Sequence, residues 1–118
     1  MIRGAVSDDG TPLIVLPVAG QEWTAVLDTG FNGDLQLPEL LRPLVNPHFL
    51  CPIVATLADG REVVEDSFEV DFPFDGLMVR AEATFVTEGD FLVGTNLLRD
   101  YVLQINFLDC TVHLQRVV

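Results

Sequence analysis

The chain has 118 residues, of which 49% are hydrophobic, so its length and composition fit one folded domain and exclude a disordered chain. Its 18 acidic and 6 basic residues give a formal net charge of −12, which argues against nucleic acid as a partner because phosphate binding requires clustered basic residues. No signal-peptide pattern is visible, and no apolar run approaches the ~20 residues that span a bilayer. We therefore expect a cytoplasmic protein without membrane contact, in which Cys51 and Cys110 form no disulfide.

The first part of the chain predicts a β-hairpin followed by a loop. An apolar run at 13–18 and an extended run at 22–27 flank a tight connection at 19–21, as in two antiparallel strands. Asp28 follows the second strand directly, and a carboxylate at that place is costly unless it is hydrogen-bonded or used. Residues 31–34 are then expected to form a loop.

The segment after this loop predicts little regular structure. Residues 35–37 alternate as a strand would, and Pro38 is expected to end that strand. One helical turn is expected at 39–41, because a proline precedes it. Two further prolines make 42–48 irregular.

The middle of the chain predicts a second hairpin. The pair Asp59-Gly60 separates extended runs at 53–57 and 62–72, and an Asp-Gly pair in that setting is a strong hairpin signal. A turn at 73–76 leads to residues 77–86, where alternate apolar side chains predict one buried face. A further turn is expected at 87–90.

The last part of the chain predicts a buried strand at 91–93 that runs into Gly94. Thr95 or Asn96 is expected to cap a short helix over 97–101. Two more strands are expected at 102–107 and 111–114. Many short strands with almost no helix indicate an all-β barrel or sandwich.

Two of these stretches resemble the signatures of one family. Residues 13–30 resemble the opening hairpin of the retropepsin-like aspartic proteases, the single-lobed clan AA enzymes of the bacterial type, and Asp28-Thr29-Gly30 resembles their active-site signature. The stretch 91–98, in which apolar residues and Gly94 precede an expected helix, resembles their second signature. The segment ending at 103–107 also resembles the strand that closes such proteins.

This resemblance spans most of the chain and implies its fold. The expected architecture is a closed or partly open β-barrel of the retropepsin-like acid protease type, with one short helix near the C-terminus. Residues 1–118 then form a single domain that carries half of an active site. A second copy completes the site, so the resemblance implies a homodimer. The chain beyond residue 107 is longer than in a minimal member of the family, and residues 111–118, together with the N-terminus, are expected to add strands at the subunit interface.

The resemblance implies an aspartic endopeptidase that acts on peptide or protein substrates. Two Asp28 carboxylates, one from each copy, face each other and share one proton. The ionised member takes a proton from water, which attacks the scissile carbonyl, and the protonated member polarises the carbonyl oxygen. Neither a metal nor another cofactor is required.

The resemblance also assigns supporting roles around Asp28. Thr29 would bond backbone across the dimer axis, while Gly30 and Gly94 would let the active-site loop and the crossing strand pack closely. The flap tip would consist of three residues, Ala58, Asp59 and Gly60, which cover the substrate. Phe31 and Asn32 are further expected substrate contacts.

Phe31 is also a departure from the family pattern. It stands where the family usually has Ser or Ala, and a serine there can donate a hydrogen bond to the pair of carboxylates, which phenylalanine cannot. We therefore expect activity that is less shifted toward acid than in the digestive members.

Three alternatives remain beside the endopeptidase. The chain could keep the fold but serve as a catalytically weak dimerisation or peptide-binding module. A small-ligand β-barrel, in which Asp28 merely ends a strand, is a weaker alternative. A zinc site formed by His48, Cys51, Cys110 and His113 is not favoured, because positions 110 and 113 of one strand point to opposite faces.

Overall fold

The computed structural model describes residues 1–117, and nearly all of its regular secondary structure is β-strand. The strands are β1 (Ile2–Val6), β2 (Pro12–Val18), β3 (Gln21–Leu27), β4 (Leu35–Pro38), β5 (His48–Thr56), β6 (Glu62–Phe74), β7 (Leu77–Val86), β8 (Leu92–Val93), β9 (Tyr101–Asn106) and β10 (Thr111–Arg116). One short 3₁₀ helix, η1 (Glu39–Leu44), lies between β4 and β5. The all-β prediction is confirmed.

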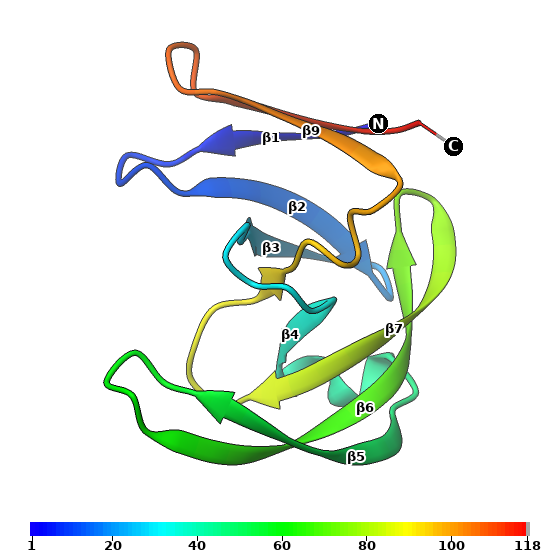
Figure 1. The fold of residues 1–118 in the computed structure, drawn as a ribbon. Helices are drawn as coiled ribbons and strands as arrows, with labels where there is room; N and C mark the ends of the chain where they lie inside the picture. Colours follow the sequence, from blue (N-terminus) through cyan, green and yellow to red (C-terminus); the bar gives the residue numbers. More distant parts are fainter. Residues whose placement is uncertain (118) are drawn as a thin grey trace.

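All ten strands belong to one strongly curved sheet with the order β5-β6-β7-β4-β8-β3-β2-β1-β10-β9. Figure 1 shows β1, β2 and β9 across one end, β5 and β6 across the other, and the short strands β4 and β8 between them. Because β5 and β9 are the two ends of the order and do not pair, the sheet is open rather than a closed barrel.

Two-residue turns set the register of two of the hairpins. Ala19 and Gly20 have φ of 50° and 81°, and they join β2 to β3 through the pair Val18↔Gln21. Asp75 at φ 54° and Gly76 join β6 to β7 in the same way. Two successive positive φ angles match the right-handed twist of antiparallel strands, which explains these tight connections.

The curved sheet encloses one apolar core. Its fully buried large side chains come from both ends of the chain and from the middle: Ile14, Leu16, Val18, Leu35, Leu37, Leu41, Val45, Val70, Phe72, Phe74, Val93 and Leu114. The alternation in β2 and in the second half of β6 places every second residue inward, as a half-buried strand requires. The core therefore ties the N-terminal hairpin to the later strands and holds the loop that follows β3.

Two predicted elements differ from the structure at the ends of strands. β5 begins at His48, well before the predicted start at 53. The helical turn predicted at 39–41 runs on to Leu44 as η1, so only 45–47 of the stretch predicted as irregular lie outside helix and strand. β6 continues through Pro73 and Phe74, so the predicted turn at 73–76 shrinks to two residues. No bounds were predicted for β1.

The predicted helix over 97–101 is wrong, because residues 95–100 form turns. The amides of Gly94, Thr95 and Asn96 donate to carbonyls of the 28–34 loop. Leu98 then donates to Thr95, and Tyr101 donates to Leu98, each closing an isolated turn across three residues. The cap predicted for Thr95 or Asn96 is therefore also wrong, because the Thr95 hydroxyl donates to the Phe31 carbonyl and Asn96 donates to Asp34.

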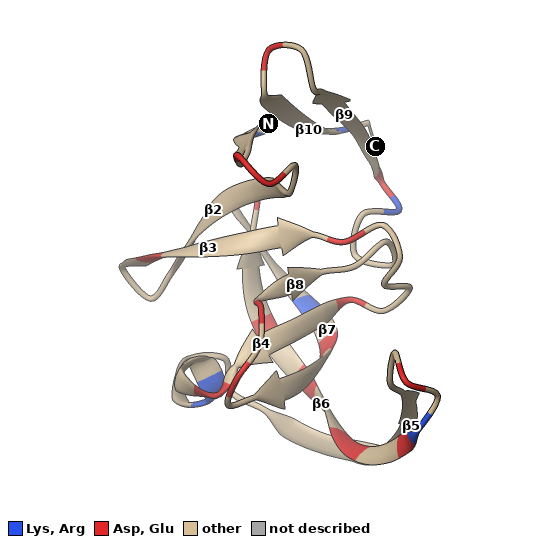
Figure 2. Cartoon of the chain, turned by 90° about the vertical axis from the view of Figure 1, so that its left-hand side faces the viewer, with Lys and Arg blue, Asp and Glu red and all other residues tan. Residues whose placement is uncertain are grey.

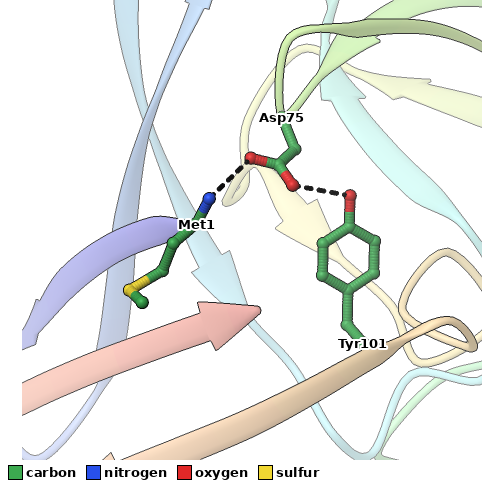
Figure 3. A network of polar contacts seen from close by, with 3 residues as sticks. All are labelled: Met1, Asp75 and Tyr101. Atoms are coloured by element: carbon green, nitrogen blue, oxygen red, sulfur yellow. Dashed lines mark hydrogen bonds and ion pairs between the residues drawn. The ribbon is translucent and has the colours of Figure 1, made fainter. Parts of the chain in front are cut away.

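A polar network ties the β6–β7 turn to the start of β9 (Figure 3). The Tyr101 hydroxyl donates to Asp75 Oδ2 at 3.2 Å, and the Met1 amino group contacts Asp75 Oδ1 at 3.4 Å. Burial, and then the hydrogen bond to Asp75, raise the pKa of Tyr101 above its ordinary value.

We expect this raised pKa to be measurable directly, because Tyr101 is the only tyrosine of the chain. The tyrosinate absorbance should titrate above about pH 10 in the folded protein and return to about pH 10 in urea. Since the unfolded chain then ionises first, stability should be unaffected below about pH 10 and should fall above it. Asp75→Asn should lower the folded midpoint only partly, because burial remains; equal midpoints in native and unfolded protein would contradict this assignment.

Candidate functional site

The candidate site is built around the 28–34 loop, which joins β3 to β4. The short strand β8 lies between these two strands, parallel to β3 through Leu27↔Val93 and antiparallel to β4 through Leu35↔Val93. The loop therefore passes around the C-terminal end of β8. Figure 2 shows where the loop begins, at the end of β3. This insertion positions the loop from both sides.

Asp28 leaves the sheet at the end of β3 with its backbone held. Its amide donates to the Val93 carbonyl at 3.0 Å, and its carbonyl accepts from the Phe31 amide at 3.1 Å. The side chain is half-buried, and Oδ1 accepts from the Gly30 amide at 2.9 Å. Within residues 1–117, Oδ2 has no hydrogen-bond partner, so one oxygen orients the carboxylate and the other is free to face a second group.

Thr29 and Gly30 complete the tight turn after Asp28. Both residues are exposed, and no hydrogen bond of the Thr29 hydroxyl occurs in the described part of the chain. A Cβ on Gly30 would lie 3.3 Å from Asp28 Oδ1, which is tighter than ordinary van der Waals contact. Because residue 30 has no side chain, the Asp28 carboxylate can keep the orientation in which it accepts from the Gly30 amide.

Gly94 and Gly33 bring the loop and the end of β8 into direct backbone contact. A Cβ on Gly94 would lie 2.1 Å from the Gly33 carbonyl oxygen, which no real side chain tolerates. The Phe31 ring lies against both glycines, because a Cβ on either residue would come within 2.8 Å of it. The aromatic ring thus fills the space that two missing side chains leave.

Asp34 joins three separate segments. Its Oδ1 accepts from Asn96 Nδ2 at 2.6 Å, and its Oδ2 accepts from the Glu82 amide of β7 at 2.9 Å. Its own carbonyl accepts from the Gly94 amide at 2.9 Å. Asp34 was not singled out in the sequence; the available signal was a polar residue directly before the apolar alternation of β4.

A cavity of about 220 Å³ opens beside the loop. Its lining is apolar at Phe31, Leu35, Ile53 and Ala83 and polar at Asn32, Gly33, Asp34, Ser67, Glu82, Thr84 and Asn96. Phe31 and Asn32, both predicted as substrate contacts, therefore line a concave surface. The contributions from β5, β6 and β7 were not predicted, because they depend on how distant strands fold over the loop.

The predicted flap corresponds to the β5–β6 hairpin. Its tip is a turn in which the Gly60 amide donates to the Leu57 carbonyl at 2.9 Å, with Gly60 at φ 85°. Ala58, Asp59 and Gly60 are all exposed there, and Arg61 forms an ion pair with Asp59 at 2.6 Å. Figure 2 shows this tip on the same side of the molecule as the end of β3.

The structure keeps the residues of the zinc alternative in different places. His48 and Cys51 belong to β5, whereas Cys110 and His113 belong to the β9–β10 hairpin near the other end of the strand order. Both cysteines are free. Among residues 1–117, no group of three or more His, Cys, Asp or Glu side chains could hold a metal ion, and no helix has the length and apolar character of a membrane span.

The open sheet, in which β8 lies between β3 and β4 behind the Asp28 loop, has the retropepsin-like fold. A solved structure described as a retropepsin-like aspartic protease from Rickettsia conorii is similar over 95% of this chain and 87% of that one. The TM-score is 0.65 and the sequence identity is 16%. No protein-family model and no curated protein sequence matches the chain, so this likeness shows the fold.

Proposed function

We propose that this protein is a homodimeric aspartic endopeptidase whose active site forms when two Asp28 carboxylates meet across a two-fold axis. The observation that carries this proposal is the loop geometry within a retropepsin-like fold. Asp28 has its backbone and one carboxylate oxygen held, and its second carboxylate oxygen is unpartnered within residues 1–117. One chain supplies one such carboxylate, which is half of the pair that the chemistry needs.

The chemistry follows from placing two carboxylates about 3 Å apart. Two negative charges at that distance are too costly, so the pair holds one proton, and its titration belongs to the pair. The ionised carboxylate takes a proton from a bound water as that water attacks the peptide carbonyl. The protonated carboxylate donates to the carbonyl oxygen, and no covalent intermediate forms.

The loop residues around Asp28 support this role. We assign the exposed Thr29 hydroxyl to a hydrogen bond with backbone of the second copy, which would keep the two loops rigid. Gly30 and Gly94 act by the space they leave, because a Cβ on Gly94 would collide with the Gly33 carbonyl oxygen. Their part in the reaction is positional, since it fixes the direction of the Asp28 carboxylate.

The substrate is proposed to lie extended between the loop and the β5–β6 hairpin. Phe31 and Asn32 line the cavity on the loop side. Ala58, Asp59 and Gly60, at the hairpin tip, would cover the peptide and bond its backbone, as an added strand is bound. Closing this tip excludes water other than the one that reacts.

Cleavage of an unstructured protein between about pH 3 and 8 tests the proposal. We expect bell-shaped activity that a hydroxyl-containing peptide of the pepstatin type inhibits and that appears only where the protein is dimeric. Because Phe31 donates no hydrogen bond to the pair, the optimum should lie well above the most acidic values. An optimum at about pH 2 would contradict the role given to Phe31.

The same measurement separates the alternatives. A stable dimer that binds the inhibitor and cuts nothing at any pH would identify a peptide-binding module with the same fold. A monomer at micromolar concentration in every buffer would remove the shared site and with it the endopeptidase.

A further inference from the structure

The face of β5, β6 and β7 that covers the cavity carries unbalanced acidic groups. Ile53 of β5 lies opposite Glu65 of β6, and Glu69 of β6 lies opposite Glu82 of β7. Opposite and alternate residues of antiparallel strands share one face, so Glu65, Ser67, Glu69 and Glu82 lie on the same side as Ile53. Ile53, Ser67 and Glu82 line the cavity, so this is the face toward the loop.

Of these acids, only Glu69 has a basic partner in the structure. Arg80 contacts it at 3.4 Å. No ion pair or hydrogen bond of the Glu65 or Glu82 side chain occurs within residues 1–117. Glu69 and Glu82 face each other directly, which is unfavourable for like charges unless a cation comes between or beside them.

No basic side chain lines the cavity. The chain has six Arg and Lys residues, and none of them, nor either His, is among the lining residues. Both carboxylate oxygens of Asp34 accept hydrogen bonds, one from the Asn96 side chain and one from the Glu82 amide, so Asp34 connects the loop to β7. The exposed Glu82 side chain is then the charged group of the lining that can meet a ligand.

We propose that the cavity selects its peptide: it takes one apolar side chain, and Glu82 selects a Lys or Arg two residues away from it. The volume of about 220 Å³ is below the roughly 300 Å³ at which whole small-molecule sites begin, so it suits a single side chain. Phe31, Leu35, Ile53 and Ala83 supply the apolar contact.

The negative charge of Glu82 then determines which side chain is favoured two residues further along the peptide. In an extended peptide, residues two apart lie about 7 Å from one another on the same side, which brings a second side chain to the rim of the cavity. A cation at the rim pairs with Glu82, whose side chain has no basic partner within residues 1–117, whereas an acidic residue is repelled by it. This inference rests on the proposed peptide-binding cleft, and it concerns which peptides that cleft takes.

Matched peptides test this selection. A digest of denatured protein, read by mass spectrometry, identifies the sites that are cut. One such peptide, or an extended peptide with a single Leu as its apolar anchor if nothing is cut, is then made with Lys, Gln or Glu two residues from the anchor. We expect kcat/KM to fall by about two- to fivefold at each step from Lys to Gln to Glu at low salt, the ratio that exposed ion pairs supply, and the differences to shrink at high salt.

Charge changes on the protein complete the experiment. Glu82→Gln should weaken the preference, and Glu82→Lys should reverse it. Glu22→Gln is the matched control, because Glu22 lies at the start of β3, six residues and about 20 Å from Asp28, and should leave the preference unchanged. Fluorescence anisotropy of the same labelled peptides measures binding separately from cleavage.

The outcomes separate this inference from the endopeptidase itself. Cleavage without any preference, or a preference that survives Glu82→Lys and high salt, would overturn the inference and leave the protease in place. Tighter binding of the Lys peptide without cleavage would support the inference and remove the protease. Neither binding nor cleavage of any peptide would overturn both.

Discussion

Asp28→Asn should abolish cleavage and leave the fold intact. The amide has the shape of the carboxylate and keeps an oxygen for the Gly30 amide, while the backbone bond to Val93 is untouched. What it loses is the ability to take a proton from water, and we expect kcat to fall by at least about a thousandfold. Peptide cleavage, dimer size and urea unfolding of the purified variant measure the three properties separately.

Asp8→Asn is the matched control for this substitution. Asp8 is exposed in the turn between β1 and β2, away from the loop, so the same chemical change there should leave kcat unaltered. Unchanged cleavage by the Asp28→Asn protein would remove Asp28 from the reaction, and with it the endopeptidase proposed here.

Mixing the two chains tests whether the site is shared. When an equal amount of Asp28→Asn chain is added and subunits exchange, half of the wild-type chains pair with an inactive copy. Activity should then fall by about half, whereas added Asp8→Asn chain should not lower it. Activity that does not change when the Asp28→Asn chain is added would show that each copy is catalytically active alone.

Among glycine-to-alanine substitutions around Asp28, Gly94→Ala should cause the largest loss of folding stability. The added Cβ would lie 2.1 Å from the Gly33 carbonyl oxygen and 2.8 Å from the Phe31 ring, so the loop must move away from β8. We expect a loss of about 3 kcal/mol or more in the free energy of unfolding, a large part of what a small domain has. Urea unfolding followed by the fluorescence of Trp23, the single tryptophan, measures it.

Gly20→Ala separates this collision from the general cost of replacing glycine. A Cβ on Gly20 meets nothing within 4 Å, although its φ of 81° is unfavourable for alanine. The expected loss there is about 1 kcal/mol. Equal losses at the two positions would mean that the contact between the loop and β8 is not as tight as described.

Turns and alternation allowed much of the fold to be predicted from the sequence. The hairpin of β2 and β3, the Asp59-Gly60 turn and the bounds of β7 all follow from local patterns, because turn residues and side-chain period act within a few positions. The two glycine-ended apolar runs, read with their resemblance to one family, led to the same fold that the comparison shows.

Other elements depend on partners far away in the chain and were missed. β1 has a weak strand pattern, but it pairs with β2 and β10, and Gly4 is placed where a Cβ would lie 2.0 Å from the Leu13 carbonyl oxygen. The expected helix after Gly94 does not form, and Leu98 and Tyr101 instead donate to carbonyls three residues back, which closes isolated turns. At both places the contacts with distant segments determine the structure, and the local propensity of the residues does not.

The sequence by itself determined where Asp28 lies, at the exit of a buried strand beside two residues that allow a tight turn. The tertiary structure alone decided what surrounds it. Asp34 binds Asn96 and β7, and strands β5 to β7 place beside the loop a cavity and a Glu82 side chain that has no partner within residues 1–117. These contacts join residues that are tens of positions apart, and no local pattern encodes which of them meet, because their pairing depends on how the whole sheet curves.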